Sequence, residues 1–479
     1  MKLIFEKSTP GQANDILPAN PLISQYAPPT EALRANAPRL PEAAEVAVVR
    51  HYMALSRMAF GVDNGFYPLG SCTMKYNPKA AERAASSPHF TDIHPLQSQD
   101  SAQGCIEVMY RLQEALNEVS GMGATSLMPA AGAQGEWVGI NIVRAYHAHN
   151  HDTKRTKVLV PDSAHGTNPA TAAMCGYEVV NIPSGPDGLV DVDALEQAAD
   201  NTTAALMLTN PNTLGKFEKN ICRIAEIVHN AGGLLYYDGA NMNAIMGVTR
   251  PGDMGFDIMH WNIHKTLATP HGGGGPGSGP VGVCKALARF LPTPMATFAD
   301  GTYALSGDDS GGIKRAKIFY GNFLVLVKAL YYVLALGADG LKEASMRAVL
   351  NANYLLRALE QYSSLRYDSP CMHEFVLSLD TLKEQTGVSA QDIAKTMIDY
   401  GVHPPTMYFP LTVGEALMFE PTETESRQTL DDMANIMDKI IHTAKNDADL
   451  LHTSPYTTPV CRPDEVKAAR EPKLRHYDH

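Results

Sequence analysis

The chain has 479 residues, of which 44% are hydrophobic and 19% are charged, the composition of an ordinary soluble globular protein. Its formal net charge is -12 and it has no run of five like charges, which argues against the clustered basic face of a nucleic-acid-binding protein. The seven cysteines are widely spaced and form no CxxC pair, so we expect reduced thiols in a cytoplasmic protein.

The N-terminal region has neither a signal peptide pattern nor a long periodic one. MKLIFEKSTP contains only three consecutive apolar residues, too few for a signal-peptide core. Residues 1–95 are rich in proline and predict an arm that wraps a larger body, with one helical stretch at 41–58. The longest apolar stretch, 323–338, is interrupted by Lys328 and is shorter than the ~20 residues of a membrane span, so we expect a buried helix there.

From about residue 105 short apolar runs alternate with helical patterns. The predicted strands are 158–161, 177–182, 204–210, 234–240, 258–263 and 280–284. The predicted helices are 105–119, 191–200 and 222–233. Strands that are apolar on both faces and alternate with helices indicate an α/β fold, with a mainly parallel sheet covered by helices on both faces.

The C-terminal part predicts a smaller α+β domain. Strands are predicted at 374–380 and 415–421, a helix at 389–402 that Ser389 caps and Gly401 closes, and a last helix from near Ser426. We expect four parts, namely an N-terminal arm (1–95), a large domain (96–335), a small domain (336–452) and an extended tail (453–479).

Three features lie where a sheet of this kind binds ligands, namely Asp238, Lys265 and a glycine-containing loop. Asp238 ends one predicted strand and Lys265 follows the next, so both lie at the carboxyl edge of the sheet. Upstream, GAQGE (132–136) opens a helix whose free N–H groups and dipole suit a phosphate. A lysine for a Schiff base, a carboxylate for a pyridinium nitrogen and a helix N-terminus for a phosphate predict pyridoxal phosphate.

Each of these features alone has an ordinary explanation. A lysine after a strand is usually a solvated charge, an aspartate at a strand end is often a turn former, and a lone glycine motif is a weak signal. The order of glycine loop, aspartate and lysine along consecutive elements is what favours the cofactor.

Longer motifs resemble one family. The segments DGANMNAIMG (238–247), RPGDMGFDIMHWNIHKT (250–266) and PHGGGGPGSGPVGV (270–283) closely resemble the glycine-cleavage P-protein, the decarboxylating glycine dehydrogenase. Similar segments lie within 68–78, 161–172 and 419–426. The chain lacks the extra N-terminal half of one-chain members and is similar to the second, pyridoxal-phosphate-binding subunit of the two-subunit form. A small departure is Met128, where single-chain members tend to have glutamine.

The resemblance implies the aspartate-aminotransferase fold (fold type I) and a role for each site residue. Lys265 would bind the cofactor covalently, Asp238 would pair with the ring nitrogen, and Ala240 would pack under the ring. The other implied contacts are His165 stacked on the ring as a proton shuttle, Thr167 at the ring hydroxyl or phosphate, and a phosphate site of His264, Gly132, Ala133 and Gln134. A buried structural histidine and a turn hydroxyl remain the alternatives for His165 and Thr167.

Two further segments have two interpretations each. In GSCTMK (70–75), a hallmark of the family, Ser71, Cys72 and Thr73 are short polar groups suited to a small carboxylate substrate, and the alternative is a packed turn. The glycines 272–275 either let the backbone pass close to a cofactor, a substrate tunnel or a partner's arm, or form a surface loop.

Rival functions fit the same residues less well. His260, His264 and His271 could ligate zinc, but their segment is strand-like and no glutamate lies between them as a hydrolytic base, so no metal is expected. GPGSG lacks the lysine and hydroxyl of a nucleotide-binding P-loop. The remaining alternatives are another enzyme of this cofactor fold, similar to serine hydroxymethyltransferase or cysteine desulfurase, and a scaffold subunit without cofactor.

The resemblance also implies an activity and partners. The expected reaction is decarboxylation of glycine, with release of CO2 and transfer of the aminomethyl group to the lipoyl arm of H-protein. The expected partners are a companion subunit 1, two copies of each subunit, and lipoylated H-protein, with no nucleic acid and no membrane. The sequence does not identify the group that binds the glycine carboxylate or the proton donor to the lipoyl sulfur.

Overall fold

The computed structural model describes residues 2–12, 29–36, 38–272, 277–307 and 312–474. The chain divides into two compact units, Met1–Asn64 and Gly65–His479. In the first unit the α-helix is α1 (Glu45–Ser56), which confirms the helical stretch predicted at 41–58. The short 3₁₀ turns of this unit are Ile4–Lys7 and Thr30–Ala32.

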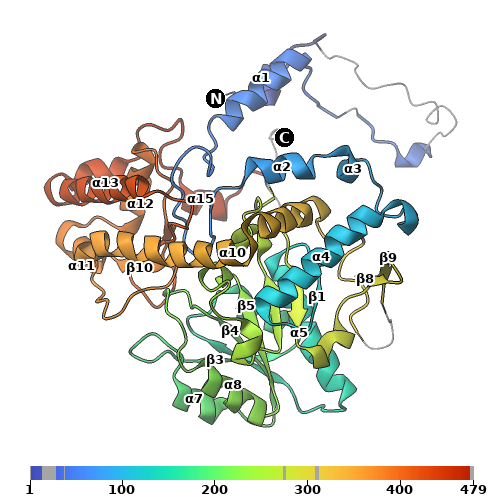
Figure 1. Ribbon diagram of the computed structural model, residues 1–479. Helices are drawn as coiled ribbons and strands as arrows, with labels where there is room; N and C mark the ends of the chain where they lie inside the picture. The colour runs from blue at the N-terminus through green and yellow to red at the C-terminus, as the bar shows by residue number, and fades with distance from the viewer. Residues whose placement is uncertain (1, 13–28, 37, 273–276, 308–311, 475–479) are drawn as a thin grey trace. The chain divides into compact units, whose positions relative to one another are not determined.

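The second unit is built on a seven-stranded sheet (Figure 1). Its strands are β1 (Ala124–Ser126), β2 (Lys157–Pro161), β3 (Glu178–Ile182), β4 (Thr203–Thr209), β5 (Leu234–Gly239), β6 (Ile258–Trp261) and β7 (Val281–Val283), in the order β1-β7-β6-β5-β4-β2-β3. β3, β2, β4, β5 and β6 run parallel, and β7 is antiparallel to both β6 and β1. The six predicted strands are confirmed.

Alternate residues of each strand face two separate cores. On β4, Leu206 and Leu208 belong to one core and Ala205 and Met207 to the other, and all four are buried. The first face is covered by α4 (Gln103–Ser120), α7 (Val192–Ala198), α8 (Ile221–Asn230) and α10 (Phe323–Leu359). The second is covered by α5 (Gly132–His149) and α6 (Thr167–Met174). The α/β architecture with helices on both faces is therefore confirmed.

The long helix α10 passes between the sheet and the pair formed by α12 (Ala390–Asp399) and α13 (Arg427–Asn446) (Figure 1). Gly337, with φ 63° and ψ -173°, interrupts its helical geometry. By length and composition, α10 is the one helix of the described residues that could cross a bilayer. Its side chains Leu326 and Leu330 lie in the sheet core, and Lys328 forms a 2.7 Å ion pair with Glu82. These contacts favour a core helix with an exposed apolar side.

The C-terminal part carries its own sheet and core. β10 (Phe375–Ser378), β12 (Ala416–Phe419) and β11 (Thr406–Met407) form a three-stranded antiparallel sheet. The helices α11 (Asp380–Thr386), α12 (Ala390–Asp399) and α13 (Arg427–Asn446) contribute to one core with it. The predicted cap Ser389 is confirmed, because its side chain accepts an N–H group at the start of α12. The last helix, α13, begins where predicted, and the Ser426 side chain accepts an N–H group there.

Several elements differ from the sequence prediction. α2 (Lys79–Ala85) and α3 (Pro88–Thr91) lie in a region where no helix is predicted. β8 (Met295–Ala299) and β9 (Thr302–Ser306) form an unpredicted hairpin. The extended conformation expected after 452 is wrong for 465–470, which form α15 (Glu465–Arg470), and α14 (Ala448–Thr453) precedes it. All are short elements whose local sequence pattern is weak.

Candidate active site

The predicted lysine and aspartate meet at the carboxyl edge of the sheet. Asp238 lies on β5 and is paired in register with His260 of β6. Lys265 lies in α9 (Ile263–Thr266), the helical turn that follows β6. Both line a cavity of about 210 Å³, whose other walls are Ser71, Gly132, Ala133, Glu136, His165, Thr167, Thr209, Thr213, Ala240, Asn241, His260, Asn262 and His264. Parallel strands that end together therefore bring residues from distant segments to one site.

Asp238 is an ionised carboxylate at the floor of this cavity. Its Oδ2 accepts a hydrogen bond from Asn168 Nδ2 at 3.0 Å, and its Oδ1 accepts one from the N–H of Ala240 at 2.9 Å. His260 Nε2 lies 3.3 Å from the same Oδ1. Burial opposes ionisation of Asp238, but the His260 ring and the Asn168 amide outweigh it and hold the pKa of Asp238 below its usual value. A fixed negative charge thus faces the cavity.

Glu136 is a second carboxyl group at this floor. Its oxygens accept hydrogen bonds from Thr167 at 2.8 Å and Thr171 at 3.2 Å. Burial, reinforced by the charge of Asp238, raises the pKa of Glu136 to about 7. His165 Nδ1 lies 2.9 Å from the Thr167 hydroxyl, and burial lowers the pKa of His165, so that its ring is neutral at pH 7. The hydroxyl of Thr167 is therefore bound to a protein carboxyl group and a histidine.

The N-terminus of α5 and His264 also line the cavity. The first N–H groups of a helix have no intrahelical acceptor, which leaves those of Gly132, Ala133 and Gln134 for a ligand. The side chain of Gln134 is bound elsewhere, because it accepts from the N–H of Ala130 and donates to the carbonyl of Ala316, each at 2.7 Å. Burial lowers the pKa of His264 to about 3, so its ring is neutral.

The cavity fits pyridoxal phosphate. A Cβ atom on Gly132 would lie 2.4 Å from Asn262 Oδ1, so only glycine lets the backbone form this wall. Two polar atoms on the walls, Thr209 Oγ1 and Asn241 Oδ1, are buried without a hydrogen-bond partner among the described residues. A lysine, a buried carboxylate and a helix N-terminus surround the same space.

Replacement of Gly132 tests whether the start of α5 forms part of the cofactor site. We expect Gly132→Ala to weaken cofactor binding at least about tenfold, since the Cβ contact must displace Asn262 and tenfold corresponds to ~1.4 kcal/mol. Titration of the protein with pyridoxal phosphate, followed by visible absorbance, measures the affinity. Gly104→Ala is the control, because a Cβ there has nothing within 4 Å. Equal affinity of the two variants for pyridoxal phosphate would contradict the assignment of the start of α5 to the cofactor site.

The GSCTMK segment wraps two buried carboxyl groups. Ser71 (φ 59°) and Thr73 (φ 47°) both adopt the left-handed conformation, which is strained for a β-branched residue such as threonine. The N–H of Ser71 donates to Glu374 Oε2 at 2.6 Å, and the N–H of Thr73 donates to Glu420 Oε2 at 2.8 Å. Their hydroxyl groups donate to the same two carboxyl groups. The carboxyl groups therefore hold the segment in its unusual conformation.

Lys75 fixes the end of the same segment. It is 1% exposed, and its Nζ lies 2.7 Å from Glu423 Oε1 and 2.8 Å from Asn243 Oδ1. The hydroxyl of Tyr332 lies 3.2 Å from the same Nζ. Burial of a lysine is costly unless it is paired, so this network ties the segment to three distant parts of the chain.

The structure separates the remaining candidates into those on the cavity wall and those behind it. Ser71 is on the wall, whereas Cys72 and Thr73 are not among the lining residues. Burial raises the pKa of the Cys72 thiol, and the carbonyl of Cys72 accepts a hydrogen bond from His271 Nε2 at 3.1 Å. Of the glycines 272–275, Gly272 is described with φ 87°, and the other three lie outside the described residues.

Sequence reasoning missed several residues of the site. Glu136, Asn168, Glu374 and Glu420 are polar side chains that contact Asp238, Thr167 or the GSCTMK segment, and Asn241 donates to Glu374. Glu136 is the last residue of the GAQGE segment, and its position on the cavity face of α5 follows from helical periodicity. Glu374 and Glu420 lie within the predicted strands 374–380 and 415–421 and adjoin the observed β10 and β12. Their partners are more than 300 residues away in the sequence.

Comparison with known proteins gives consistent matches. The profile of "Glycine dehydrogenase, C-terminal domain" matches residues 344–454, and that of "Aminotransferase class-V" matches residues 134–274. A probable glycine dehydrogenase (decarboxylating) subunit 2 from Treponema denticola is 58% identical over 475 residues, covering 99% of this chain and 98% of the relative. The protein of the same name from Caldanaerobacter subterraneus subsp. tengcongensis is 56% identical over 479 residues, with coverages of 99% and 98%.

Solved structures agree on the fold. A glycine decarboxylase (P-protein) of the glycine cleavage system, in inhibitor-bound form, superposes with a TM-score of 0.72 at 22% identity, covering 86% of this chain and 93% of that one. A cysteine desulfurase from Escherichia coli superposes with a TM-score of 0.59 at 16% identity, covering 79% and 95%. At these identities the likeness shows a shared fold, the one predicted from the sequence.

Proposed function

Because the chain belongs to the glycine dehydrogenase (decarboxylating) subunit 2 family, we propose that it is the pyridoxal-phosphate-binding subunit of an enzyme that decarboxylates glycine. The observation that carries this proposal is the position of Lys265 and Asp238 at adjacent strand ends, in one cavity with the N-terminus of α5. That arrangement supplies an amine, an anion and a phosphate site to one ligand. The aminomethyl group that remains after CO2 leaves passes to the lipoyl disulfide of H-protein.

Each residue of the cavity has a distinct task. Lys265 would hold the cofactor covalently, and the N–H groups at the start of α5 would hold its phosphate. Asp238 would keep the ring nitrogen protonated, since its own pKa is held low. Bound pyridoxal phosphate supplies an electron sink for the electron pair of the breaking C–C bond.

The neutral histidines position the cofactor without adding charge. His165 would stack on the ring, and its lowered pKa keeps it neutral and able to accept a proton. His264 would donate a hydrogen bond to the phosphate, and the small side chain of Ala240 would leave room for the ring. The walls that these residues form exclude water, which strengthens each fixed charge.

A companion subunit completes the proposed enzyme. The relatives are named subunit 2, which supports a subunit 1 beside this chain. We propose two copies of each subunit in the assembly. The outward side of α10 exposes Leu334, Met346 and Leu350, an apolar surface of the kind that partner chains cover. All seven cysteines are free, which supports a cytoplasmic location.

Reconstitution tests the function. We expect this chain alone to bind pyridoxal phosphate and to show less than about a tenth of the exchange of labelled bicarbonate into glycine that the co-expressed pair shows with lipoylated H-protein. Light scattering of the purified pair should give the mass of two copies of each subunit. Full exchange activity from this chain as a lone monomer would contradict the proposed assembly, and no exchange from the complete mixture would contradict the proposed reaction.

A further inference from the structure

Glu374 and Glu420 form a carboxyl pair directly behind the cavity wall. Glu374 precedes β10 and Glu420 follows β12, and the register that pairs Phe375 with Phe419 places the two acids opposite each other. Both are 0% exposed. An oxygen of each and a ring nitrogen of His373 lie within 4.8 Å of one another. Two acids are therefore enclosed together, away from water.

This pair retains a proton at neutral pH. Two negative charges at such a separation repel strongly in a medium of low dielectric constant. Burial raises the pKa of Glu420 to about 7, and burial together with the charge of Glu420 raises the pKa of Glu374 well above its usual value. His373 does not neutralise the pair, since burial lowers the pKa of His373 to about 3. The other titratable groups that act on the pair are Lys265, Cys72 and Glu423.

His373 is a third buried polar group beside the pair. It is 0% exposed, and its Nε2 points at Glu420 Oε1 from 3.8 Å. Neither ring nitrogen has a hydrogen-bond partner among the residues that the structure describes. A buried histidine without partners costs folding free energy and is unusual away from functional sites.

Ser71 connects the pair to the cavity. Its hydroxyl oxygen lies 3.1 Å and 3.2 Å from the two oxygens of Glu374, and Ser71 itself lines the cavity with Lys265. Asn241 also lines the cavity and donates to Glu374 Oε1 at 3.1 Å, but an amide does not pass on a proton. A hydroxyl group both donates and accepts, so Ser71 is the side chain that can transmit the proton of the buried acid.

The proposed reaction consumes one proton. The C–C bond of glycine breaks and CO2 leaves, and the electron pair of that bond ends in a new C–S bond to one lipoyl sulfur. The S–S bond breaks, and its electron pair stays on the other sulfur, which takes a proton to become a thiol. The neutral rings of His165 and His264 hold no spare proton for this step, because burial lowers the pKa of both.

We propose that the Glu374–Glu420 pair stores this proton and that Ser71 delivers it to the departing sulfur. Ser71 gives its hydroxyl proton to the sulfur and takes the proton of Glu374 in return, and solvent later returns a proton to the pair. Ser71 is thus the catalytic residue, and the two glutamates are positioning residues that act through it. The inference rests on the proposed function, since it assigns the proton source for the same reaction.

The relay, in which a proton passes from Glu374 through Ser71 to the sulfur, is tested on the complete assembly with two variants. Each variant is assayed for two rates, bicarbonate exchange and thiol formation. Ser71→Ala removes the hydroxyl and leaves the acids, and Glu374→Gln keeps the shape and removes the exchangeable proton. Bicarbonate exchange into glycine only breaks and re-forms the C–C bond and needs no net proton, whereas formation of the lipoyl thiol needs one. We expect both variants to lower thiol formation by about 10²-fold, as for loss of a general acid, and to lower exchange much less, so that the ratio of thiol formation to exchange falls at least about tenfold.

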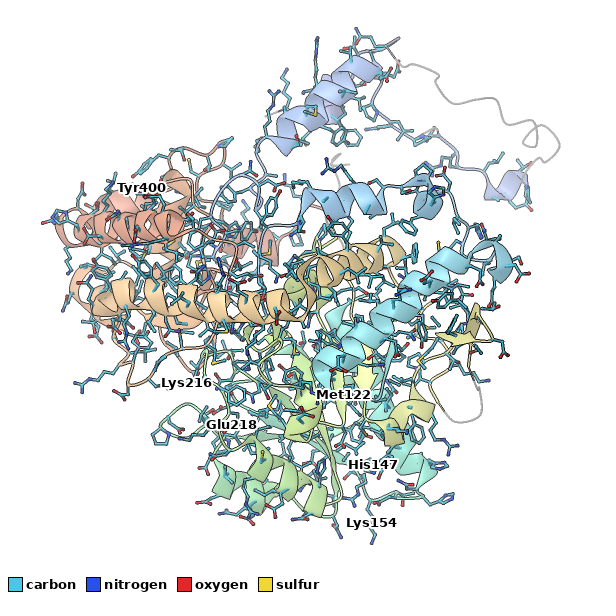
Figure 2. The ribbon with its side chains drawn as sticks, in the orientation of Figure 1. Met122, His147, Lys154, Lys216, Glu218 and Tyr400 are labelled. Carbon is cyan, nitrogen blue, oxygen red and sulfur yellow. The ribbon has the colours of Figure 1, made fainter. Side chains whose placement is uncertain are left out.

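Glu218→Gln is the matched control (Figure 2). Glu218 is also buried and accepts backbone N–H groups, those of Val190 at 2.9 Å and Asn220 at 3.1 Å, but it does not line the cavity. Infrared spectra at neutral pH should show a protonated carboxyl band that Glu374→Gln weakens and Glu218→Gln leaves unchanged, and Glu136, whose pKa burial raises to about 7, accounts for part of the band that remains. This readout does not depend on activity or on the cofactor.

The pH dependence gives a second check on the pair. The stored proton is present below the pKa of the pair and is lost as the pH rises through it, so thiol formation should fall with rising pH. Glu420→Gln removes the neighbouring negative charge, which lowers the pKa of Glu374 and should move this fall to lower pH. An unshifted profile would overturn the role of the pair.

The remaining outcomes are also decisive. Equal losses of exchange and thiol formation in Ser71→Ala would show that Ser71 only shapes the site, and unchanged thiol formation would show that no proton passes through it. Either result overturns the relay while the proposed function stands. Absence of exchange in the unmodified assembly would instead overturn the proposed function.

Discussion

We expect Lys265→Ala to abolish covalent attachment of pyridoxal phosphate and to lower glycine decarboxylation by about 10⁴-fold, as for removal of the nucleophile from a catalytic set. Lys265 is the lysine on the wall of the cavity, and it lies beside Asp238 on the neighbouring strand end. Its side chain is only half-buried in α9, so its removal leaves the two sheet cores intact. The fold should therefore survive.

The measurement is visible absorbance before and after reduction with borohydride, which fixes an imine between lysine and cofactor. Lys154→Ala is the control, because Lys154 is an exposed lysine of the same unit far from the cavity lining (Figure 2). Its absorbance should equal that of the unmodified chain. A borohydride-reducible chromophore in Lys265→Ala would show that a different lysine holds the cofactor.

The main sheet and its ligand edge could be predicted because their signals are local. Strands buried on both faces have runs of apolar residues, as in 204–210, and each run ends at a polar residue or turn. In a parallel sheet these ends share one edge, so Asp238 and Lys265 could be placed together from their order in the sequence. The three-residue strand β1 is too short to show any period and was missed.

The partners of the GSCTMK segment could not be predicted in this way. Ser71 and Thr73 look like free donors for a substrate carboxylate in the sequence, and that role stays a prediction. In the structure their N–H groups bind Glu374 and Glu420, which reach them from the C-terminal sheet. Such a contact depends on how two sheets pack, and a single sequence contains no periodic signal of it. The division into four domains likewise stays a prediction.

Asp238→Asn should retain the fold and the bound cofactor and lose decarboxylation by about 10²- to 10³-fold, the scale of a lost electrostatic contact to a developing charge. Asparagine has nearly the same size, and its Oδ1 can accept the N–H of Ala240 as Asp238 does. The amide nitrogen of the new asparagine would face Asn168 Nδ2, and two donors form no hydrogen bond. Asn168 Oδ1 is buried without a partner among the described residues, so rotation of the Asn168 amide lets it accept the new N–H group. The hydrogen bonds are therefore kept and only the charge is lost.

The lost charge matters because in the proposed function it would hold the proton on the ring nitrogen of the cofactor, and a protonated ring would draw electrons from the breaking bond. Bicarbonate exchange into glycine measures this step directly, and absorbance confirms that the cofactor is bound. Asp257→Asn is the matched control, since Asp257 also accepts a backbone N–H, that of Leu235 at 2.8 Å, but precedes β6 at the opposite edge of the sheet. It should leave exchange unchanged. Near-normal exchange in Asp238→Asn would mean that a group other than Asp238 sets the charge of the cofactor ring. Glu136, the other carboxyl group that lines the cavity, would then be the residue to replace.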